Sequence, residues 1–84
     1  MPYIKQVNRK PIDKLLNGLL EYQFTVGELN YVITRLIDTH CAERGYQILN
    51  DAVGVLECVK QEFYRRRVAP FEDEKCRENG EVYV

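Results

Sequence analysis

The residues that could do chemistry are concentrated in the stretch from Asn50 to Pro70, NDAVGVLECVKQEFYRRRVAP. Within it, Glu62 precedes Arg65 and Arg66 by three and four residues. Side chains at those spacings meet on one face of a helix, where an ion pair is worth roughly 0.2–0.5 kcal/mol. The pattern predicts a solvated charged face, with a binding site as the alternative.

A second polar set in the same stretch consists of Glu57, Gln61 and Tyr64, which recur at steps of four and three. These residues would form a polar strip beside the apolar face of the helix. The polar side of the preceding predicted helix carries Asn30, Tyr31 and Thr34. If the two polar sides meet, a buried or cleft-lining network results, and such a network favours a role in helix register over catalysis.

Carboxylates are a third group of candidates for chemistry. Carboxylate oxygens suit Mg²⁺ or acid–base work, so a third hypothesis is a carboxylate site built from Glu28, Glu57 and Glu62 with Glu72 or Asp73. The chain has few other residues or motifs that are typical of enzymes. It has no serine and one histidine, and it contains neither of the phosphate-binding motifs GxxxxGK[ST] and GxGxxG. We therefore expect no enzyme activity, no cofactor and no resident metal.

The basic triplet RRR raises the possibility of nucleic-acid binding through Lys60 and Arg65–Arg67. Binding to a phosphate backbone requires several aligned cations. The acidic run Glu72–Glu74 follows closely and offsets their field, and no basic recognition helix is evident. Nucleic-acid binding is the alternative function and not the favoured one.

Three cysteines stand 17 and 18 residues apart, without a CxxC pair or a short metal-ligand spacing. Free thiols in a reducing cytoplasm are the natural interpretation. His40 directly precedes Cys41. Neighbours on a helix point about 100° apart, so we expect a partly buried core histidine and not a thiol with its base.

Eighty-four residues make one small helical domain, residues 1–84, with a thin core. Apolar residues make up 45% and charged residues 30%, with a net charge of −1. This composition indicates a soluble folded protein with no general attraction to nucleic acid or membrane. No apolar run is long enough to span a bilayer. A core this thin gains from a partner surface, so we expect a homodimer.

The expected fold is all-α, with three to four helices and extended arms at both ends. Residues 1–9 are expected to be an extended arm, with Pro11 in the first turn of a helix over residues 11–22. The motif TVGE at Thr25–Glu28 is a capping box that opens the second helix, and Gly45 is expected to end it.

The third helix is expected to begin at Asn50, after a link at 45–49, and to end or kink at Ala69 because Pro70 follows. A short fourth helix is expected from Pro70 to about Glu78, before an extended tail. The third helix places one apolar stripe, which we expect to be the centre of the core. Its members are Ala52, Val55, Leu56, Val59 and Phe63.

The chain also contains several ordered blocks: MPYIKQ at 1–6, GELNYVIT at 27–34 and GVLECVKQEFYRRRVAPFEDEKCRENGEVY at 54–83. In these blocks it resembles a family of short uncharacterised prokaryotic and bacteriophage proteins. The resemblance covers nearly the whole chain and brings no activity, ligand or partner with it. Phe71 stands where tyrosine is frequent in that family, which argues against a role for a hydroxyl group there.

The resemblance implies a set of polar residues that a minimal helical core would not require. Together with Arg66 they form the candidate interaction network: Glu28, Asn30, Tyr31, Glu57, Glu62, Tyr64, Arg65, Arg66, Glu72, Asp73, Asn79 and Tyr83. The tail ENGEVY belongs to the pattern, so we expect it to dock, and an arm that crosses to a second protomer would explain it. The favoured function is a small cytoplasmic interaction or regulatory protein, phage- or mobile-element-associated, that acts as a homodimer on a further protein partner.

Overall fold

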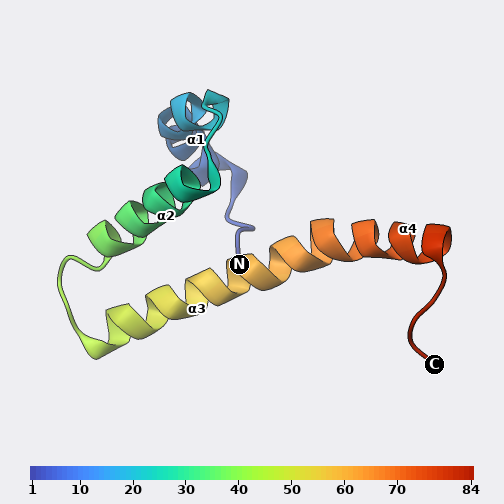
Figure 1. Ribbon diagram of the computed structural model, residues 1–84. Helices are drawn as coiled ribbons and strands as arrows, with labels where there is room; N and C mark the ends of the chain where they lie inside the picture. The colour runs from blue at the N-terminus through green and yellow to red at the C-terminus, as the bar shows by residue number, and fades with distance from the viewer. The chain divides into compact units, whose positions relative to one another are not determined.

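The computed structural model describes residues 1–84, and every regular element in it is helical, which confirms the all-α class (Figure 1). Contacts between residues divide the chain into two units. The first unit is Pro2–Ala52, and the second is Val53–Val84 together with Met1, so the boundary lies inside a helix. The helices are α1 (Gln6–Glu21), α2 (Val26–His40), α3 (Tyr46–Phe63), the π-helical segment η1 (Tyr64–Val68) and α4 (Ala69–Asn79).

Helix α1 begins at Gln6, so the expected extended arm over residues 1–9 is wrong for its second half. Pro11 lies inside the helix and not in its first turn. The first four N–H groups of a helix have no partner within it, so a proline shortly after them removes only one further bond. Arg9 Nε donates to the carbonyl oxygen of Ile4 at 2.8 Å, which ties the preceding residues to the helix start.

The capping box of α2 is confirmed in both directions. Thr25 N–H donates to Glu28 Oε1 at 2.9 Å, and Glu28 N–H donates to Thr25 Oγ1 at 3.2 Å. The helix ends at His40, and Cys41 N–H bonds the carbonyl of Ile37 at 3.1 Å. The expectation that Gly45 ends this helix in a left-handed conformation is wrong, because Gly80 is the only glycine with a positive φ.

Gly45 instead precedes the start of α3, and its carbonyl accepts from Leu49 N–H at 3.1 Å. The expected link at 45–49 is therefore already helical from Tyr46, and Asn50 lies inside the helix and does not cap it. Tyr, Gln, Ile and Leu are all acceptable helix formers, so nothing in residues 46–49 opposes an earlier start. Gln47 Nε2 reaches Asp51 Oδ1 at 2.8 Å across this first turn.

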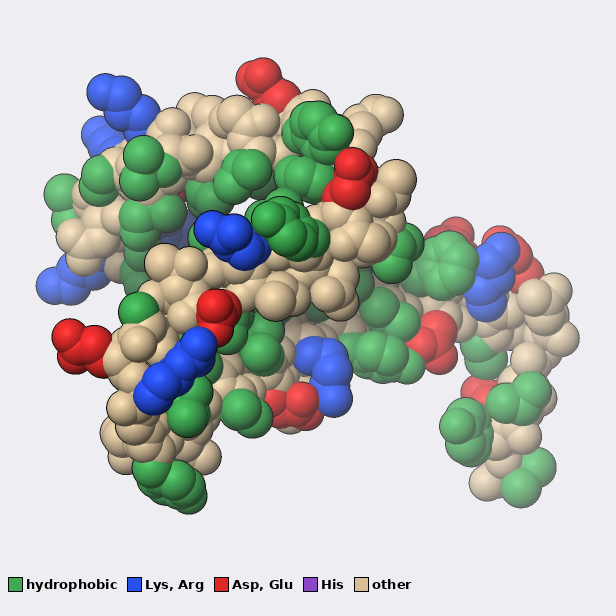
Figure 2. All heavy atoms as spheres, turned by 60° about the vertical axis from the view of Figure 1, so that its left-hand side comes forward, with side chains coloured by type: hydrophobic (Ala, Val, Ile, Leu, Met, Phe, Trp, Pro, Cys, Tyr) green, Lys and Arg blue, Asp and Glu red, His purple; other side chains and the backbone are tan.

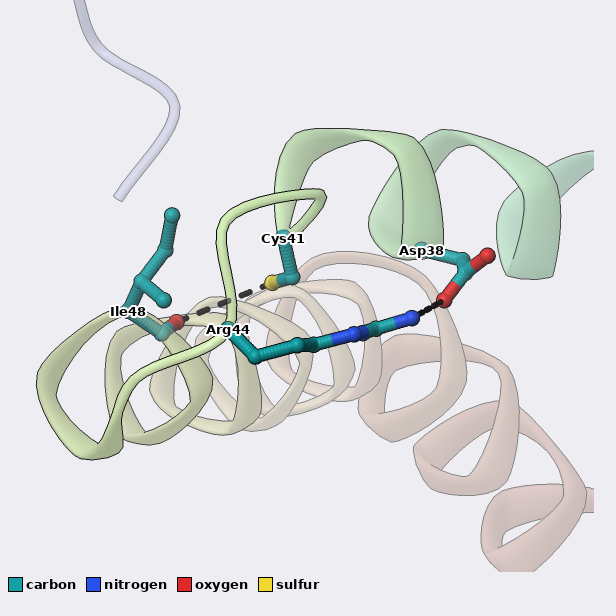
Figure 3. Close-up of polar contacts among 4 residues, drawn as sticks. All are labelled: Asp38, Cys41, Arg44 and Ile48. Carbon is teal, nitrogen blue, oxygen red and sulfur yellow. Dashed lines mark hydrogen bonds and ion pairs between the residues drawn. The ribbon is translucent and has the colours of Figure 1, made fainter.

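The short connection between α2 and α3 holds the most buried side chain of the protein, Cys41, at 1% exposure. Its thiol points to the carbonyl oxygen of Ile48, with Sγ at 3.7 Å (Figure 3). Near this thiol, the exposed side chains of Arg44 and Asp38 form an ion pair at 2.6 Å (Figure 3). His40, in contrast, is exposed, so the expected partly buried core histidine is wrong.

From Val53 onward the chain stays helical to Asn79, through α3, η1 and α4 (Figure 1). In η1 the hydrogen bonds skip one residue more than in an α-helix, and Ala69 N–H donates to the carbonyl of Tyr64, five residues back. Of the two outcomes expected at Ala69, an end or a kink, the end is wrong, because the helix continues through Pro70 near the start of α4. A proline would break the hydrogen bonds of a regular α-helix at this position, and in the wider turn the N–H groups bond carbonyls five residues back instead.

Helix α4 matches the expected fourth helix to within one residue at each end. Gly80 ends it at φ 97°, and Gly80 N–H bonds the carbonyl of Cys76 at 2.8 Å. Glu81 then folds back, with Oε1 accepting from the N–H groups of Val82 and Tyr83 at 2.9 and 2.8 Å. Val82 and Tyr83 themselves remain exposed.

Very few side chains are buried. Only Cys41 and Ala52 are buried, and hydrophobic side chains stand at the surface among charged ones (Figure 2). The expected core stripe of α3 is therefore wrong for four of its five members, since Val55, Leu56, Val59 and Phe63 are all exposed. No helix combines the length and apolarity that crossing a membrane would need.

Candidate functional site

The π-helical segment η1 changes which side chains share a face of the second unit. In an α-helix, residues eight apart are about 80° apart around the axis. A turn closed by bonds to the fifth residue holds about one residue more, so eight residues through η1 cover close to two turns. Residues on either side of η1 that are eight apart should then lie in line.

Tyr64 and Glu72 are eight residues apart and provide the direct evidence for this alignment. Tyr64 Oη donates to Glu72 Oε1 at 2.5 Å, which joins η1 to α4. This bond and the carboxylate charge of Glu72 raise the pKa of the Tyr64 hydroxyl above its ordinary value. The neutral phenol is the form that donates this bond, so the bond holds Tyr64 in its protonated state.

Phe63 and Phe71 are also eight residues apart, so the same geometry places Phe71 in line with Phe63. Both rings are about 60% exposed. Together with the exposed apolar residues of α3 they lie along one side of the helix, and we call this set the apolar stripe. It consists of Val55, Leu56, Val59, Phe63 and Phe71.

The charged candidates of α3 pair locally, beside the apolar stripe. Glu57 accepts from Lys60 at 3.0 Å and from Gln61 Nε2 at 3.2 Å, and the Lys60 bond is the main cause of a lowered Glu57 pKa. Arg65 Nη2 binds Glu62 Oε1 at 2.7 Å, as the spacing predicts. These pairs are exposed, and exposed pairs contribute little to stability.

The strip Glu57, Gln61, Tyr64 is thus divided between two contacts. Glu57 and Gln61 bond each other, and Tyr64 bonds Glu72. A surface hollow of about 610 Å³ lies along this flank. It is lined by Lys60, Gln61, Tyr64, Arg65 and Ala69.

Four of the predicted residues meet at the C-terminal end, around a hollow of about 380 Å³ between α4 and the tail. Glu72, Asp73, Asn79 and Tyr83 line it. On the same wall, Cys76 Sγ donates to Glu81 Oε2 at 3.2 Å, which raises the pKa of the Cys76 thiol. A thiol held protonated is a poor nucleophile, so this end of the molecule is not arranged for thiol chemistry.

The three candidates on α2 belong to the first unit and have local roles or none. Glu28 completes the capping box, and Asn30 Oδ1 accepts from Thr34 Oγ1 at 3.3 Å. Tyr31 is 60% exposed. No three histidine, cysteine or carboxylate side chains gather in a way that could hold a metal ion.

The feature that sequence reasoning missed is the π-helical segment. Pro70 was the available signal, since a proline directly after a long helical period must either end the helix or disturb its hydrogen bonds. The spacing of eight between two aromatic residues, Phe63 and Phe71, was a second signal. Both are meaningful only if the helix continues through the proline.

We expect the Tyr64 hydroxyl to titrate above the ordinary pKa of a tyrosine, because of its bond to Glu72. Its pKa is raised in the folded state, so its contribution to stability is present below the ordinary value near 10 and is lost as pH rises through the raised pKa. The difference in absorbance at 295 nm between wild type and Tyr64→Phe isolates this titration. Glu72→Gln should lower the Tyr64 pKa, and an unchanged value would contradict the bridge.

The three thiols should react with a maleimide in a fixed order. Cys58 is exposed and should react first, and Cys76 should be slower because Glu81 holds its proton. Cys41 is buried and should react only on unfolding. Peptide mapping over time checks the order, and Glu81→Gln should accelerate Cys76 alone. Equal rates at Cys58 and Cys76 would contradict the thiol–carboxylate bond.

Comparison with known proteins adds a family assignment. The sequence profile of a domain of unknown function, DUF6899, matches residues 1–82. The chain belongs to that family. The DUF6899 match contains the first two sequence blocks and all of the third except Tyr83. No curated protein and no solved structure matches the chain. Membership in DUF6899 therefore identifies the chain without assigning it a reaction.

Proposed function

We propose that this protein is a small non-catalytic interaction module that acts as a homodimer through the apolar stripe. The observation that carries the proposal is the exposure of the stripe in a chain that buries only two side chains. Val55, Leu56, Val59, Phe63 and Phe71 are 41–61% exposed. Exposed large apolar side chains grouped on one side of a helix are typical of interaction sites in soluble proteins.

The free energy of burying these side chains also favours association. Burying apolar surface contributes about 25 cal/mol per Å², or roughly 1.5–3 kcal/mol for one large side chain. These side chains are already about half covered in their own chain, so five of them on each of two copies contribute about 8–15 kcal/mol, against an association cost on the order of 4–15 kcal/mol. A symmetric pair uses the same stripe twice, and this makes a second copy the simplest cover for it.

The proposed setting of the module is the cytoplasm of a prokaryotic cell. Three cysteines without a disulfide agree with a reducing compartment. The ordered sequence blocks support a phage- or mobile-element-associated origin. The homodimer would then present its polar flanks, including the hollow between α4 and the tail, to a further protein.

The proposal is tested by sedimentation velocity over a range of concentrations. We expect one species at twice the 9.9 kDa chain mass at micromolar concentration, which dissociates on dilution. A single species of 9.9 kDa at every concentration would overturn the homodimer. Added Mg²⁺ and single-stranded or duplex nucleic acid serve as comparisons in the same experiment.

Nucleic-acid binding through Lys60 and Arg65–Arg67 is the second candidate, with less support. Lys60 and Arg65 are already paired with Glu57 and Glu62, which leaves Arg66 and Arg67 without a carboxylate partner. Two cations provide only a weak phosphate site. A salt-dependent mobility shift that Arg66→Ala and Arg67→Ala abolish would favour this candidate over the first.

A further inference from the structure

The charges along the second unit are ordered in blocks. The basic block Arg65–Arg67 lies in η1, and the acidic block Glu72–Glu74 lies in the first turns of α4. The two blocks stand on either side of Ala69, at similar distances along the helix. Figure 1 shows this part of the chain as a single run of helix from α3 to α4.

Two copies of such a helix can pair in only two simple ways. In a parallel pair the basic blocks face each other and so do the acidic blocks, and like charges repel. In an antiparallel pair with the two-fold axis near Ala69, each basic block faces the partner's acidic block. The charge order therefore favours the antiparallel pair, because opposite blocks also fix the register.

The antiparallel arrangement also provides partners for other exposed groups. Counting outward from Ala69, Phe63 lies opposite the partner's Lys75, and Lys60 lies opposite the partner's Glu78. Lys75 already lies over an aromatic ring in its own chain, with Nζ 5.5 Å from the Phe71 centroid. A cation over an aromatic face is favourable, so the opposition of Phe63 and Lys75 is compatible with pairing.

The same arrangement places the exposed tail of each copy along the partner's α3. Beyond Gly80 an extended chain advances about 3.3 Å per residue, against 1.5 Å in a helix. The tail of one copy would therefore run past the partner's Val59 toward Leu56 and Val55. Val82 and Tyr83, both about 85% exposed, are then available to cover that end of the apolar stripe.

We infer that the second copy of this chain pairs antiparallel along the α3–η1–α4 helix, with the two-fold axis near Ala69 and each tail over the partner's α3. The inference rests on the homodimer proposed above and adds its direction and register. In this register Arg65 and Arg66 lie opposite the partner's Asp73 and Glu72, and Lys60 lies opposite the partner's Glu78.

Cross-linking of variants with a single accessible cysteine tests the direction, since the remaining Cys41 is buried. In a Cys58→Ala, Cys76→Ala background, Lys60→Cys and Glu78→Cys are made in separate chains and mixed, and a short bismaleimide is added. The antiparallel pair predicts cross-links between residue 60 of one chain and residue 78 of the other, and few between identical positions. Links from 60 to 60 and from 78 to 78 would overturn the inference while leaving the homodimer intact.

Charge reversal tests the register. The acidic variant Arg65→Glu, Arg66→Glu and the basic variant Glu72→Lys, Asp73→Lys should each dimerise more weakly than wild type, because residues 65 and 66 lie opposite the partner's residues 73 and 72. The chain with all four changes should recover wild-type affinity, because each block again faces its opposite. Raising salt should weaken the wild-type dimer by roughly tenfold. A dimer that salt strengthens, or a four-fold variant that stays weak, would overturn the antiparallel register. A chain that is monomeric throughout would instead contradict the homodimer itself.

Discussion

Replacing Phe63 by Glu should dissociate the homodimer while leaving the single chain folded. Phe63 is 61% exposed, so its ring contributes little packing within the chain. Glutamate is at least as good a helix former as phenylalanine. In a symmetric dimer both copies lose the ring, at roughly 2 kcal/mol each, and about 4 kcal/mol corresponds to a change in the dissociation constant on the order of 10³.

A matched control is available on the same helix. Val53 is 65% exposed and lies about 80° away from Phe63 around α3. Val53→Glu makes the same apolar-to-acidic change outside the apolar stripe and should leave the dissociation constant within a few fold of wild type. Sedimentation measures both variants, and circular dichroism confirms that both stay helical. Equal effects of the two substitutions would contradict a specific interface.

Replacing Pro70 by Ala should have opposite effects on the helix and on the dimer. An alanine restores the missing N–H, so the segment can return to regular α-helix and gain up to ~3 kcal/mol. Phe71 would then turn out of line with Phe63, and Glu72 out of line with Tyr64. We expect the monomeric chain to melt at a higher temperature and the pKa of Tyr64 to fall. The dissociation constant of the dimer should rise by about 10² or more.

A deletion provides the rescue for this prediction. Removing Val68 from the Pro70→Ala chain reduces the spacing between Phe63 and Phe71 from eight to seven residues. Seven residues make close to two turns of α-helix, so the two rings should line up again without a π-helical turn. The shortened chain should regain most of the dimer affinity. If Pro70→Ala dimerises as wild type does, the alignment by η1 has no role in association.

The sequence was sufficient for the elements whose signals are local. The capping box at Thr25 and Glu28, the glycine end at Gly80 and the pair of Glu62 with Arg65 depend on residues three or four apart. Such interactions are fixed by side-chain type and helix geometry alone. The all-α class followed from the same periodicity.

The failures have a common cause, which is competition between neighbouring signals. Asn50 and Gly45 each carry a capping preference, but Tyr46–Leu49 can extend α3, and propensity alone cannot rank these options. Pro70 disfavours a regular helix at that position, and the structure continues through it by a wider turn. Periodicity places the apolar residues of α3 on one side of the helix. It does not show whether they pack against another part of the same chain or against another molecule.

The sequence predicted which residues belong to the candidate site but not which of them contact one another. Tyr64 and Glu72 were both named, yet their contact depends on η1 and could not be read from a spacing of eight. Asn79 and Tyr83 came from the resemblance alone, and they share a hollow with Glu72 and Asp73. The carboxylates proposed for a metal ion do not gather in a group that could hold one.

The claim that the apolar stripe of α3 and α4 is an interface between two copies is tested most directly by amide hydrogen exchange at two concentrations. Above the dissociation constant, the amides of residues 53–71 should be protected, and dilution below it should remove most of that protection. The amides of α2 should change little and serve as the internal reference. Protection of residues 53–71 that does not depend on concentration would contradict the account.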